Sequence, residues 1–392
     1  MSGAIRQKEK HMKDIKEIRK EINGIDEELV RLFRRRLEIV EEVAQSKRER
    51  RAPVLDPARE REILYRVAGE VGPEYENGAR LLFSTLFGIS RARQRAALGG
   101  PSKLVDSIRS AADAGGTFPT RTLVACPGTE GAYAQQATSL VFPLPTILYF
   151  DGFENVFSAV EKDLCPYGIL PIENSAAGSV APVYDAMVRH HFHIVKALRL
   201  RINHVLLAVP GVKIEDIKEI SSHPHALAQC GEFLRAHPGW QQIPQTNTAV
   251  AAKSLGKMRQ KNRAVIASRA CAELYGLDVL QENISNTAVN YTRFICISKN
   301  LEIYPDANKF SIMMSLPHRP GSLNTIISKF AAINVNLTKL ESRPVPGMDF
   351  EFRFTFDFEA SPRDPNVLAL LAELAADPEI EHFTFLGAYA ET

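Results

Sequence analysis

Apolar residues in the first quarter of the chain recur at alternating three- and four-residue steps. The series begins at Ile15 and Ile18 and continues to Leu32. Such spacing places the apolar side chains on one stripe of a long helix. Residues 14–97 also contain few chain breakers and almost no run typical of a strand. The pattern therefore predicts an all-α helical bundle over residues 10–98.

The last block, residues 308–390, switches between the two-residue period of strands and the longer period of helices. Strands are predicted at KFSIMMSLP, VNLTKLESRPV, FEFRFTFDFE and HFTFLGAY, and helices at 321–332 and NVLALLAELA. The order βαββαβ is that of the α+β ferredoxin-like arrangement. The third strand carries a stripe of phenylalanines on one face, which we interpret as core and not as a platform for nucleic acid. The stripe comprises Phe350, Phe352, Phe354, Phe356 and Phe358.

Residues 121–300 alternate short β-rich runs with helical stretches, which is the pattern of an α/β domain. The predicted strands include TLVAC, YGILPI, HVLLAV, AVIAS and RFICIS. The preceding segment, 99–120, is small, polar and flanked by Gly and Pro, so it is predicted to be a linker with room for one short helix. The chain is thus expected to be multidomain.

The composition is that of a globular protein, with 392 residues of which 45% are hydrophobic and 24% charged. No apolar run approaches the roughly 18 residues that a membrane helix needs, and the first residues lack the apolar core of a secretory signal. We therefore expect a cytoplasmic protein with no membrane partner. The five cysteines are scattered and form no CxxC or Cys/His cluster, so we expect reduced thiols and no metal site.

Charge is distributed unevenly, because residues 1–100 contain 22 Lys and Arg against 17 Asp and Glu. Basic runs at 34–36 and 47–51 raise the alternative of a nucleic-acid surface. Acidic residues intersperse these cations, and no aromatic residues alternate with them. We therefore expect no nucleic-acid partner and favour an anionic small molecule as the reason for the basic excess.

Two cations, Arg36 and Lys47, occupy places on the apolar seam of the first helix. In one interpretation their long stems carry the charges out to water. In the other, both point into a cavity that holds an anion, because an unpaired buried cation is costly. Asp56 followed by proline signals the start of a second helix. Further polar residues on the second and third predicted helices favour a pocket inside the bundle; they are Arg59, Glu60, Ser90 and Gln94.

In this order and spacing, these residues resemble the all-helical chorismate mutases. The resemblance implies an intertwined homodimer that rearranges chorismate to prephenate without covalent or acid–base catalysis. Catalysis would rest on enforced conformation and on donors aimed at the ether oxygen as it gains negative charge. The implied donors are Lys47 and Gln94. The implied carboxylate ligands are Arg36, Arg59 and, reaching in from the partner subunit, Arg19. The implied substrate-binding residues also include Asp56, Ser90 and, at the ring hydroxyl, Glu60.

Polar residues gather at the ends of predicted strands in the central region, where ligands bind in α/β sheets. Each segment alone has an ordinary turn or capping role, and the glycine turn in GTEGAYA (128–134) lacks the pattern of a nucleotide-binding loop. Their joint occurrence predicts one cleft. The residues are Glu173, Asn174 and Ser175, then Ser222, Gln229 and Thr248, and finally Thr292, Arg293 and Phe294.

The segments GTEGAYA, PIENSAAG, INHVLL, SHPHALAQC and NYTRF together resemble the prephenate dehydratases, over about residues 121–300. The resemblance implies an α/β domain of two subdomains that flank a cleft, like a periplasmic binding protein, and loss of water and carbon dioxide from prephenate to give phenylpyruvate. The implied catalytic residues are Glu173 and Thr292, with Thr292 at the leaving hydroxyl. The implied substrate-binding residues are Asn174, Ser175, Ser222, Gln229, Thr248, Phe294 and Arg293, although Arg293 is either an anion holder or a structural partner.

The general acid of the dehydratase reaction stays open at this point. His223 has a suitable solution pKa, yet a histidine before proline in a turn also serves as a cap. Two residues depart from the family pattern: Ala134 stands where Ser or Thr is common, and His225 stands where Gln is common. We expect altered affinity from these departures and not a loss of activity.

Two motifs of the last block resemble the effector-binding motifs of the amino-acid-binding ACT domain. One departs mildly, because Ser322 replaces the usual alanine. The resemblance implies a side-by-side dimer that binds L-phenylalanine at its interface. The implied effector-binding residues are Gly321, Ser322, Leu323, Glu341, Ser342, Arg343 and Pro344.

The sequence therefore predicts a bifunctional enzyme of phenylalanine biosynthesis. Its substrates would be chorismate and prephenate, its effector L-phenylalanine, and its assembly a homodimer or higher homo-oligomer; no cofactor is expected. Two alternatives remain. The helical domain of a monofunctional dehydratase would serve only to dimerise, and a ligand-binding sensor would catalyse neither reaction.

Overall fold

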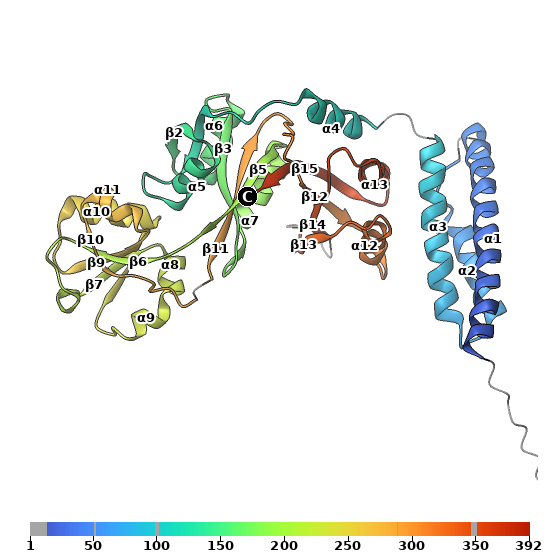
Figure 1. Cartoon of the computed structure of the whole chain (residues 1–392), viewed down its shortest axis with the longest axis horizontal. Helices are drawn as coiled ribbons and strands as arrows, with labels where there is room; N and C mark the ends of the chain where they lie inside the picture. Colours follow the sequence, from blue (N-terminus) through green and yellow to red (C-terminus); the bar gives the residue numbers. More distant parts are fainter. Residues whose placement is uncertain (1–13, 51, 99–101, 288, 346–350) are drawn as a thin grey trace, which may run out of the picture. The chain divides into compact units, whose positions relative to one another are not determined.

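The computed structural model describes residues 14–50, 52–98, 102–287, 289–345 and 351–392. The chain divides into two units between Ser102 and Lys103 (Figure 1). Residues 10–13 of the predicted helical domain and Phe350 of the predicted stripe lie outside the described residues. Within the described part, no helix is both long and apolar enough to cross a membrane.

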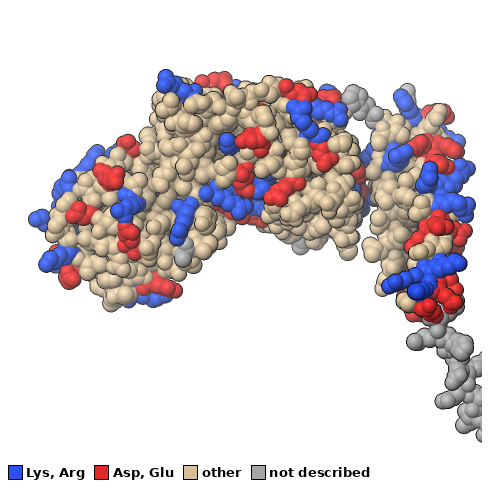
Figure 2. All heavy atoms as spheres, viewed as in Figure 1, with Lys and Arg blue, Asp and Glu red and all other residues tan. Residues whose placement is uncertain are grey.

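The first unit contains three helices in its described part, as the apolar period predicts. They are α1 (Ile15–Arg50), α2 (Pro57–Val71) and α3 (Glu76–Leu98). The side chain of Asp56 accepts a hydrogen bond from the backbone N of Arg59 at 3.0 Å, so the predicted N-cap starts α2. Val40 and Ala44 of α1 are buried in this unit. On the face of the unit that Figure 2 shows, basic and acidic side chains are interspersed.

The N-terminal half of the α1 seam is not covered within one chain. Ile15, Ile22, Ile25 and Leu29 are each at least half exposed. A stripe of apolar residues on a long helix loses its stabilisation when it faces water. The seam therefore has the character of a surface that another helix covers.

The predicted linker contains one short helix, α4 (Lys103–Ala114), for which the sequence left room. Its apolar face includes Val105, Ile108 and Ala112, which are buried in the same core as the final block of the chain. Ile108 is fully buried. Polar residues at 106, 107, 109 and 110 made the segment resemble a linker, but its apolar residues keep a helical period. This helix therefore belongs to the second unit.

The second unit begins with an α/β subdomain whose strands lie in the order β2-β1-β3-β11-β5. β1 is parallel to β2 and β3, whereas β11 is antiparallel to both β3 and β5. The strands are β1 (Arg121–Pro127), β2 (Leu144–Phe150), β3 (Tyr167–Asn174), β5 (His193–Arg201) and β11 (Tyr291–Ser298), with the short β4 (Gly178–Ser179) beside β3. The helices are α5 (Tyr133–Val141), α6 (Phe153–Glu161) and α7 (Ala181–His190).

A second α/β subdomain is inserted between β5 and β11, so the chain crosses between the subdomains twice (Figure 1). Its sheet has the order β10-β6-β9-β7-β8. The strands are β6 (Val205–Ala208), β7 (Glu219–Ser222), β8 (Gln241–Pro244), β9 (Arg263–Ala267) and β10 (Asp278–Gln281). The helices are α8 (Pro224–Gln229), α9 (Gly231–Arg235), α10 (Thr248–Met258) and α11 (Ala270–Tyr275), and a 3-10 turn spans Ile214–Asp216. Two subdomains joined by two crossings agree with the predicted architecture.

The final block, here called the C-terminal module, has the predicted βαββαβ order. Its strands pair in the order β13-β14-β12-β15. Phe356 and Phe358 are fully buried, and Phe354 packs against the same core, so these three residues of the stripe are core as predicted. The elements are β12 (Lys309–Leu316), α12 (Ser322–Ala332), β13 (Leu337–Pro344), β14 (Phe352–Glu359), α13 (Pro365–Ala376) and β15 (Glu381–Glu391).

The C-terminal module and the first α/β subdomain share one sheet. The end of β15 pairs in parallel with β5, and both backbone groups of Thr392 bond to β5, at Ala197 and Arg199. A Cβ at Gly387 would collide with the carbonyl oxygen of Ile194, so glycine lets the two backbones approach. The segment that joins the two predicted domains, residues 301–307, therefore connects strands of one ten-stranded sheet of the described chain.

Replacing Ile108 with alanine tests the position of α4. We expect Ile108→Ala to lower the free energy of unfolding of the second unit by about 3 kcal/mol, because it leaves a cavity in the core. Trp240, the single tryptophan, reports this unfolding by fluorescence in urea. Ser107→Ala, on the exposed face of the same helix, is the matched control. Equal urea midpoints for the two variants would contradict the buried position of Ile108 and would indicate that the segment is a linker.

Candidate active sites

The helical unit contains a polar cluster between α1 and α3. Arg36 donates to the hydroxyl of Ser90 and, at 3.3 Å, to the carbonyl oxygen of Leu86. Its guanidinium carbon lies 5.9 Å from the centre of the Phe87 ring. Burial lowers the pKa of Arg36. This cation therefore points into the bundle, as the anion-pocket interpretation predicts.

Two other predicted residues lie on the inner side of the same bundle. Gln94 is one helical turn after Ser90, is only 7% exposed, and its Oε1 has no hydrogen-bond partner among the described residues. A buried amide oxygen without a partner calls for a ligand or a water. The half-buried Lys47 donates from Nζ to the carbonyl oxygen of Val54 at 2.5 Å, which ties the end of α1 to the segment before α2.

A further cation, Arg91, lies in this cluster and was not among the predicted residues. Its Nη1 lies 2.5 Å from Oε1 of Glu60, and both side chains are largely buried. The carboxylate that was predicted to hold a substrate hydroxyl thus already has a cationic partner. The signal in the sequence was weak, because Arg91 is one of several arginines in SRARQR.

Three predicted residues of this site do not join the cluster within one chain. Arg59 is exposed and forms an ion pair with Glu62 at 2.8 Å, and the Asp56 carboxylate is used as the helix cap. Arg19 lies 17 residues before Arg36 on one helix, or about 26 Å away at 1.5 Å per residue. Arg19 can therefore approach such a cluster only from another chain.

The second unit holds a ring of hydrogen-bonded amides where its two subdomains meet. Asn174 Nδ2 donates to Asn290 Oδ1 at 2.8 Å, Asn290 Nδ2 donates to Gln229 Oε1 at 3.1 Å, and Gln229 Nε2 returns to Asn174 Oδ1 at 3.5 Å. The three residues come from β3, from the crossing before β11 and from α8 of the other subdomain. We call this set the amide ring.

The orientation of the amide ring is fixed by the backbone. Asn174 Oδ1 accepts hydrogen bonds from the backbone N of Ala176 and Ala177, both at 3.0 Å. Its amide nitrogen must therefore face the other way, and it donates to Thr292 Oγ1 at 2.9 Å. Because Thr292 accepts this bond, its own hydroxyl hydrogen remains available for a ligand.

His204, on the crossing before β6, extends the amide ring. Its Nε2 lies 3.0 Å from Gln229 Oε1, and its Nδ1 lies 3.4 Å from the hydroxyl of Tyr133. Burial lowers the pKa of His204, although the bond to Gln229 acts in the opposite direction. Neither His204 nor Asn290 was singled out from the sequence, although both belong to the segments INHVLL and NYTRF.

The glycine-bearing turn after β1 meets the start of α10 across the two subdomains. The space beside Gly128 Cα is filled by Nδ2 of Asn247, since a Cβ there would lie 2.8 Å from it. Asn247 caps α10, whose first residue is the predicted site residue Thr248. Lys253 of α10 lies 3.4 Å from the hydroxyl of Thr129. Free backbone N–H groups at such a helix start suit a carboxylate.

Comparison with known proteins decides the family. A family model for prephenate dehydratase matches residues 124–302, and one for chorismate mutase type II matches residues 18–95. Arogenate dehydratase 2 of Petunia hybrida is 38% identical over 279 residues, which cover 66% of this chain and 70% of that protein. The chain belongs to the prephenate dehydratase family.

Two further proteins agree with this assignment. The chloroplastic arogenate dehydratase/prephenate dehydratase 1 of Arabidopsis thaliana is 40% identical over 264 residues, which cover 63% of this chain and 67% of that protein. The crystal structure of prephenate dehydratase in complex with L-Phe from Arthrobacter aurescens shares 31% identity, covers 68% of this chain and 89% of that chain, and has a TM-score of 0.61.

The two family models lie on different units of the chain. The match over 18–95 covers the helical unit, and the match over 124–302 covers the two α/β subdomains. The chain is therefore a bifunctional enzyme of phenylalanine biosynthesis, with a chorismate mutase domain and a prephenate dehydratase domain. The interpretation of the helical unit as a dimerisation element alone is not supported.

Two predicted residues of the dehydratase domain face away from the amide ring, and a third is buried in core. Glu173 directly precedes Asn174 on β3, and Arg293 directly follows Thr292 on β11. Successive side chains of a strand point to opposite faces. Both turn toward the C-terminal module, where Glu173 meets Lys339 at 3.0 Å and Arg293 meets Asp357 at 2.5 Å. Phe294 is buried in the apolar core of the first subdomain. The structure therefore does not bring Glu173 or Phe294 to the amide ring, where a catalytic role and a substrate contact were predicted, and Arg293 has the structural partners of its second interpretation.

Other predicted residues of this domain have structural contacts. Ser222 is fully buried and donates to the carbonyl oxygen of Ile266 at 2.6 Å, so it stabilises the second sheet and does not line the cleft. Ser175 Oγ accepts from the backbone N of Tyr291 at 2.9 Å, next to the amide ring. His223 Nδ1 accepts from the backbone N of His225, and burial lowers its pKa, which agrees with a capping histidine. Ala134 is buried in core and His225 is exposed.

The predicted effector motifs divide between two faces of the C-terminal module. Glu341 contacts Ser179 of the dehydratase domain, and Arg343 lies over its Tyr184 ring. Burial opposes the charge of Glu341, but Ser179, Lys339 and Arg343 together lower its pKa. Ser342 and Pro344 alternate to the other, exposed face of β13. Gly321 is exposed at the start of α12, Leu323 is half-buried, and Ser322 Oγ has no partner among the described residues.

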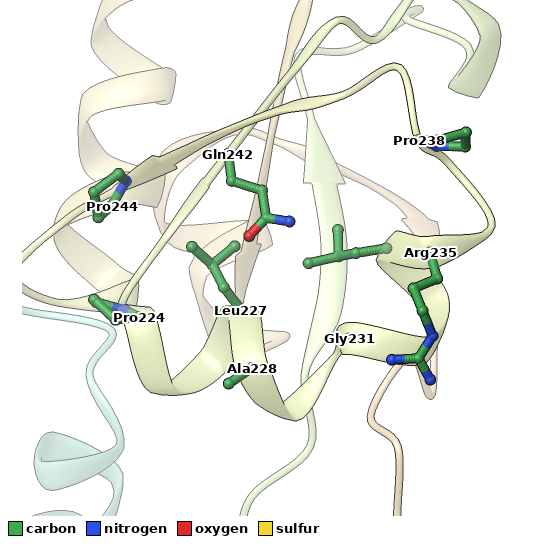
Figure 3. Close-up of a pocket in the computed structure, with 9 residues that line it drawn as sticks. Pro224, Leu227, Ala228, Gly231, Arg235, Pro238, Gln242 and Pro244 are labelled. Carbon is green, nitrogen blue, oxygen red and sulfur yellow. The ribbon is translucent and has the colours of Figure 1, made fainter.

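A separate hollow lies in the second subdomain. It has a volume of about 700 Å³ between α8, α9 and β8, and its lining is mainly apolar. Figure 3 shows Pro224 and Pro244 at one end and Arg235 and Pro238 at the other. None of the predicted site residues lines this hollow.

Proposed function

We propose that Thr292 and Asn174 carry the dehydratase chemistry. In this reaction the bond to the ring carboxylate breaks and releases carbon dioxide, its electron pair enters the ring, and the hydroxyl departs with a proton as water. Aromatisation drives the step, so the enzyme needs to hold the substrate and to donate toward the departing oxygen. Asn174, oriented by two backbone N–H groups, directs the Thr292 hydroxyl hydrogen away from itself and toward the ligand. This observation carries the proposal.

The substrate carboxylates need partners other than Arg293. We assign them to the start of α10 at Thr248 and to the backbone of the turn at 128–131, because helix N-termini bind carboxylates. Gln229 and His204 connect the amide ring to the second subdomain, so closure of the two subdomains on a ligand would move both residues. Prephenate is the assigned substrate because the mutase domain of the same chain forms it. Arogenate, which occurs in the names of the plant relatives, is to be measured beside it.

In the mutase domain, Arg36 is proposed to hold a carboxylate, and Lys47 and Gln94 to meet the ether oxygen. Arg36 points into the bundle, and Gln94 is buried beside it, so the amide nitrogen of Gln94 is the group that would donate to the ether oxygen. A homodimer would cover the exposed seam of α1 and would supply Arg19 from the partner subunit. The compartment proposed is the cytoplasm.

The C-terminal module is proposed to be an ACT domain that binds L-phenylalanine. Its βαββαβ order, the exposed edge strand β13 and the motifs at Gly321 and Ser342 support this. The related dehydratase of Arthrobacter aurescens was crystallised with L-Phe.

Single substitutions should separate the two activities. Lys47→Ala is expected to lower the mutase rate about 100-fold or more, since one transition-state donor is lost. Thr292→Ala is expected to lower phenylpyruvate formation from prephenate by about 100-fold or more, since proton donation to the leaving group is lost. Each variant is assayed for both reactions, so the untouched activity shows that the protein is folded.

Thr292→Ser keeps the hydroxyl and should retain most of the dehydratase rate. A Thr292→Ala enzyme with a normal rate on prephenate would contradict the assignment of Thr292. A normal mutase rate in Lys47→Ala would contradict the assignment of Lys47.

Subunit complementation tests the contribution of Arg19. Arg19→Ala and Lys47→Ala chains are each expected to lack mutase activity. Their co-expression should restore activity at about a quarter of the sites, because half of the dimers are mixed and each mixed dimer has one intact site. No recovery in dimers shown to be mixed would place Arg19 in the site of its own chain or outside it.

Calorimetry on the full-length chain tests the effector. L-Phenylalanine is expected to bind, and D-phenylalanine is the matched control with the same composition and charge. The absence of binding heat at millimolar L-phenylalanine would contradict an ACT domain of this specificity.

A further inference from the structure

The strands β3 and β11 carry two pairs of residues directly opposite one another. Thr292 pairs with Asn174, and Arg293 pairs with Glu173. Opposite residues of antiparallel strands share a face, and neighbouring pairs alternate. The first pair faces the amide ring. The second pair, on the reverse face, meets charged residues of the C-terminal module.

Arg293 is held by several partners at once. Its Nη1 lies 2.5 Å from Oδ2 of Asp357, and its Nη2 donates to the hydroxyl of Tyr389 at 2.5 Å. Its Nε lies 2.6 Å from Oε1 of Glu391, an ion pair without the angle of a hydrogen bond. Arg293 is 6% exposed and Asp357 is 1% exposed. A buried guanidinium needs these partners, and its rigid fork accepts few orientations.

The charges around Arg293 agree with a permanently ionised group. Burial opposes the charge, but Tyr389, Asp357 and Glu391 together raise the pKa of Arg293 above its ordinary value. Asp357 also accepts from the hydroxyl of Ser311 at 2.5 Å, so its carboxylate is itself fixed. The position of Arg293 is thus set from the C-terminal module.

Glu173 has a corresponding partner, Lys339 of β13. The Lys339 Nζ lies 3.0 Å from Oε2 of Glu173 and 2.7 Å from the hydroxyl of Ser179. Ser179, in β4, is the residue that pairs with Glu173 of β3. Lys339 also meets Glu341 at 3.1 Å and is mostly buried. The end of β3 that presents Asn174 is thus attached to the C-terminal module by one cation.

We infer that Asp357 and Lys339 are positioning residues of the dehydratase site. Asp357 acts through Arg293 on the backbone that presents Thr292, and Lys339 acts through Glu173 on the backbone that presents Asn174. Neither touches the amide ring. The 2.9 Å contact between Asn174 and Thr292 depends on the relative placement of the two strands, and displacements of about 1 Å cost about 100-fold in rate. The inference rests on the proposed roles of Asn174 and Thr292.

The test uses full-length Asp357→Asn and Lys339→Met, with kcat and KM measured for phenylpyruvate formation from prephenate. We expect kcat to fall about 10- to 100-fold in each variant while KM changes little, because the chemistry and not the carboxylate contacts is misaligned. The mutase rate of the same preparation should match that of the wild type. Lys339→Arg keeps the cation and should recover most of kcat.

Glu373→Gln is the matched control. It breaks an ion pair with Lys329, at 2.6 Å and of comparable burial, between α12 and α13 of the same module and away from β3 and β11. Its kcat should equal that of the wild type. An equal loss in this control would overturn the inference, since it would indicate a general loss of structure. A change in KM alone would overturn it by indicating a role in binding, and no rescue by Lys339→Arg would overturn it by showing that the cation is not required.

Asn174→Ala and Thr292→Ala separate this inference from the proposed function. If both lose activity while Asp357→Asn and Lys339→Met keep the wild-type kcat, the positioning role is wrong and the proposed site stands. If both remain active, the proposed site itself is wrong. Should Asp357→Asn fail to fold, the Lys339 variants decide, because Lys339 is less deeply buried than Asp357 and methionine retains its aliphatic stem.

Discussion

The two-residue alternation of β3 and β11 is the constraint on which the dehydratase half of this protein depends. Because successive side chains point to opposite faces, the strand pair that presents Asn174 and Thr292 to the cleft must present Glu173 and Arg293 to the other side. A cleft needs polar groups on the first face. The charges on the second face then need partners, and the C-terminal module provides them. The contact between the dehydratase domain and the C-terminal module thus follows from the alternation of side chains on β3 and β11.

The sequence divides into three regions of different pattern, but in the structure the second and third regions are joined. The helical mutase unit is separate from the rest, whereas β15 continues the dehydratase sheet beside β5 and its last residue bonds to that strand. Helix α4, which precedes the dehydratase domain in the chain, packs in the core of the C-terminal module. A ligand that changed the edge strand β13 would therefore act on a surface already attached to the catalytic strands through Lys339, Glu341 and Arg343.

Much of the fold follows from local patterns in the sequence. The apolar seam gives α1, Asp56-Pro57 gives the start of α2, and alternation around Phe356 and Phe358 gives a core strand. Each of these signals arises from neighbouring residues. The composition of residues 99–120 left room for helix α4 but did not show that its apolar face packs in the core of the C-terminal module. A short amphipathic helix and a linker share a composition.

The site residues were harder to predict, since their partners are distant in sequence. Arg293 faces Asp357 and Glu391, and no local pattern indicates that pairing. The alternation of strand residues did indicate part of the answer. Thr292 and Arg293 are neighbours on one strand and cannot both face one cleft, and the same holds for Glu173 and Asn174. His204 and Asn290 were passed over because each lies in a short crossing without a recognisable turn or cap. Their importance appears only when the two crossings come together beside Gln229.

The most direct test of the account is a rate assay on the purified wild-type chain with chorismate as the only substrate. Phenylpyruvate should form from chorismate, with prephenate as the intermediate, and it should also form from prephenate added alone. This result would establish both reactions on one polypeptide. Phenylpyruvate from prephenate but not from chorismate would contradict the bifunctional assignment, and folded protein that forms it from neither would contradict the enzymatic assignment as a whole.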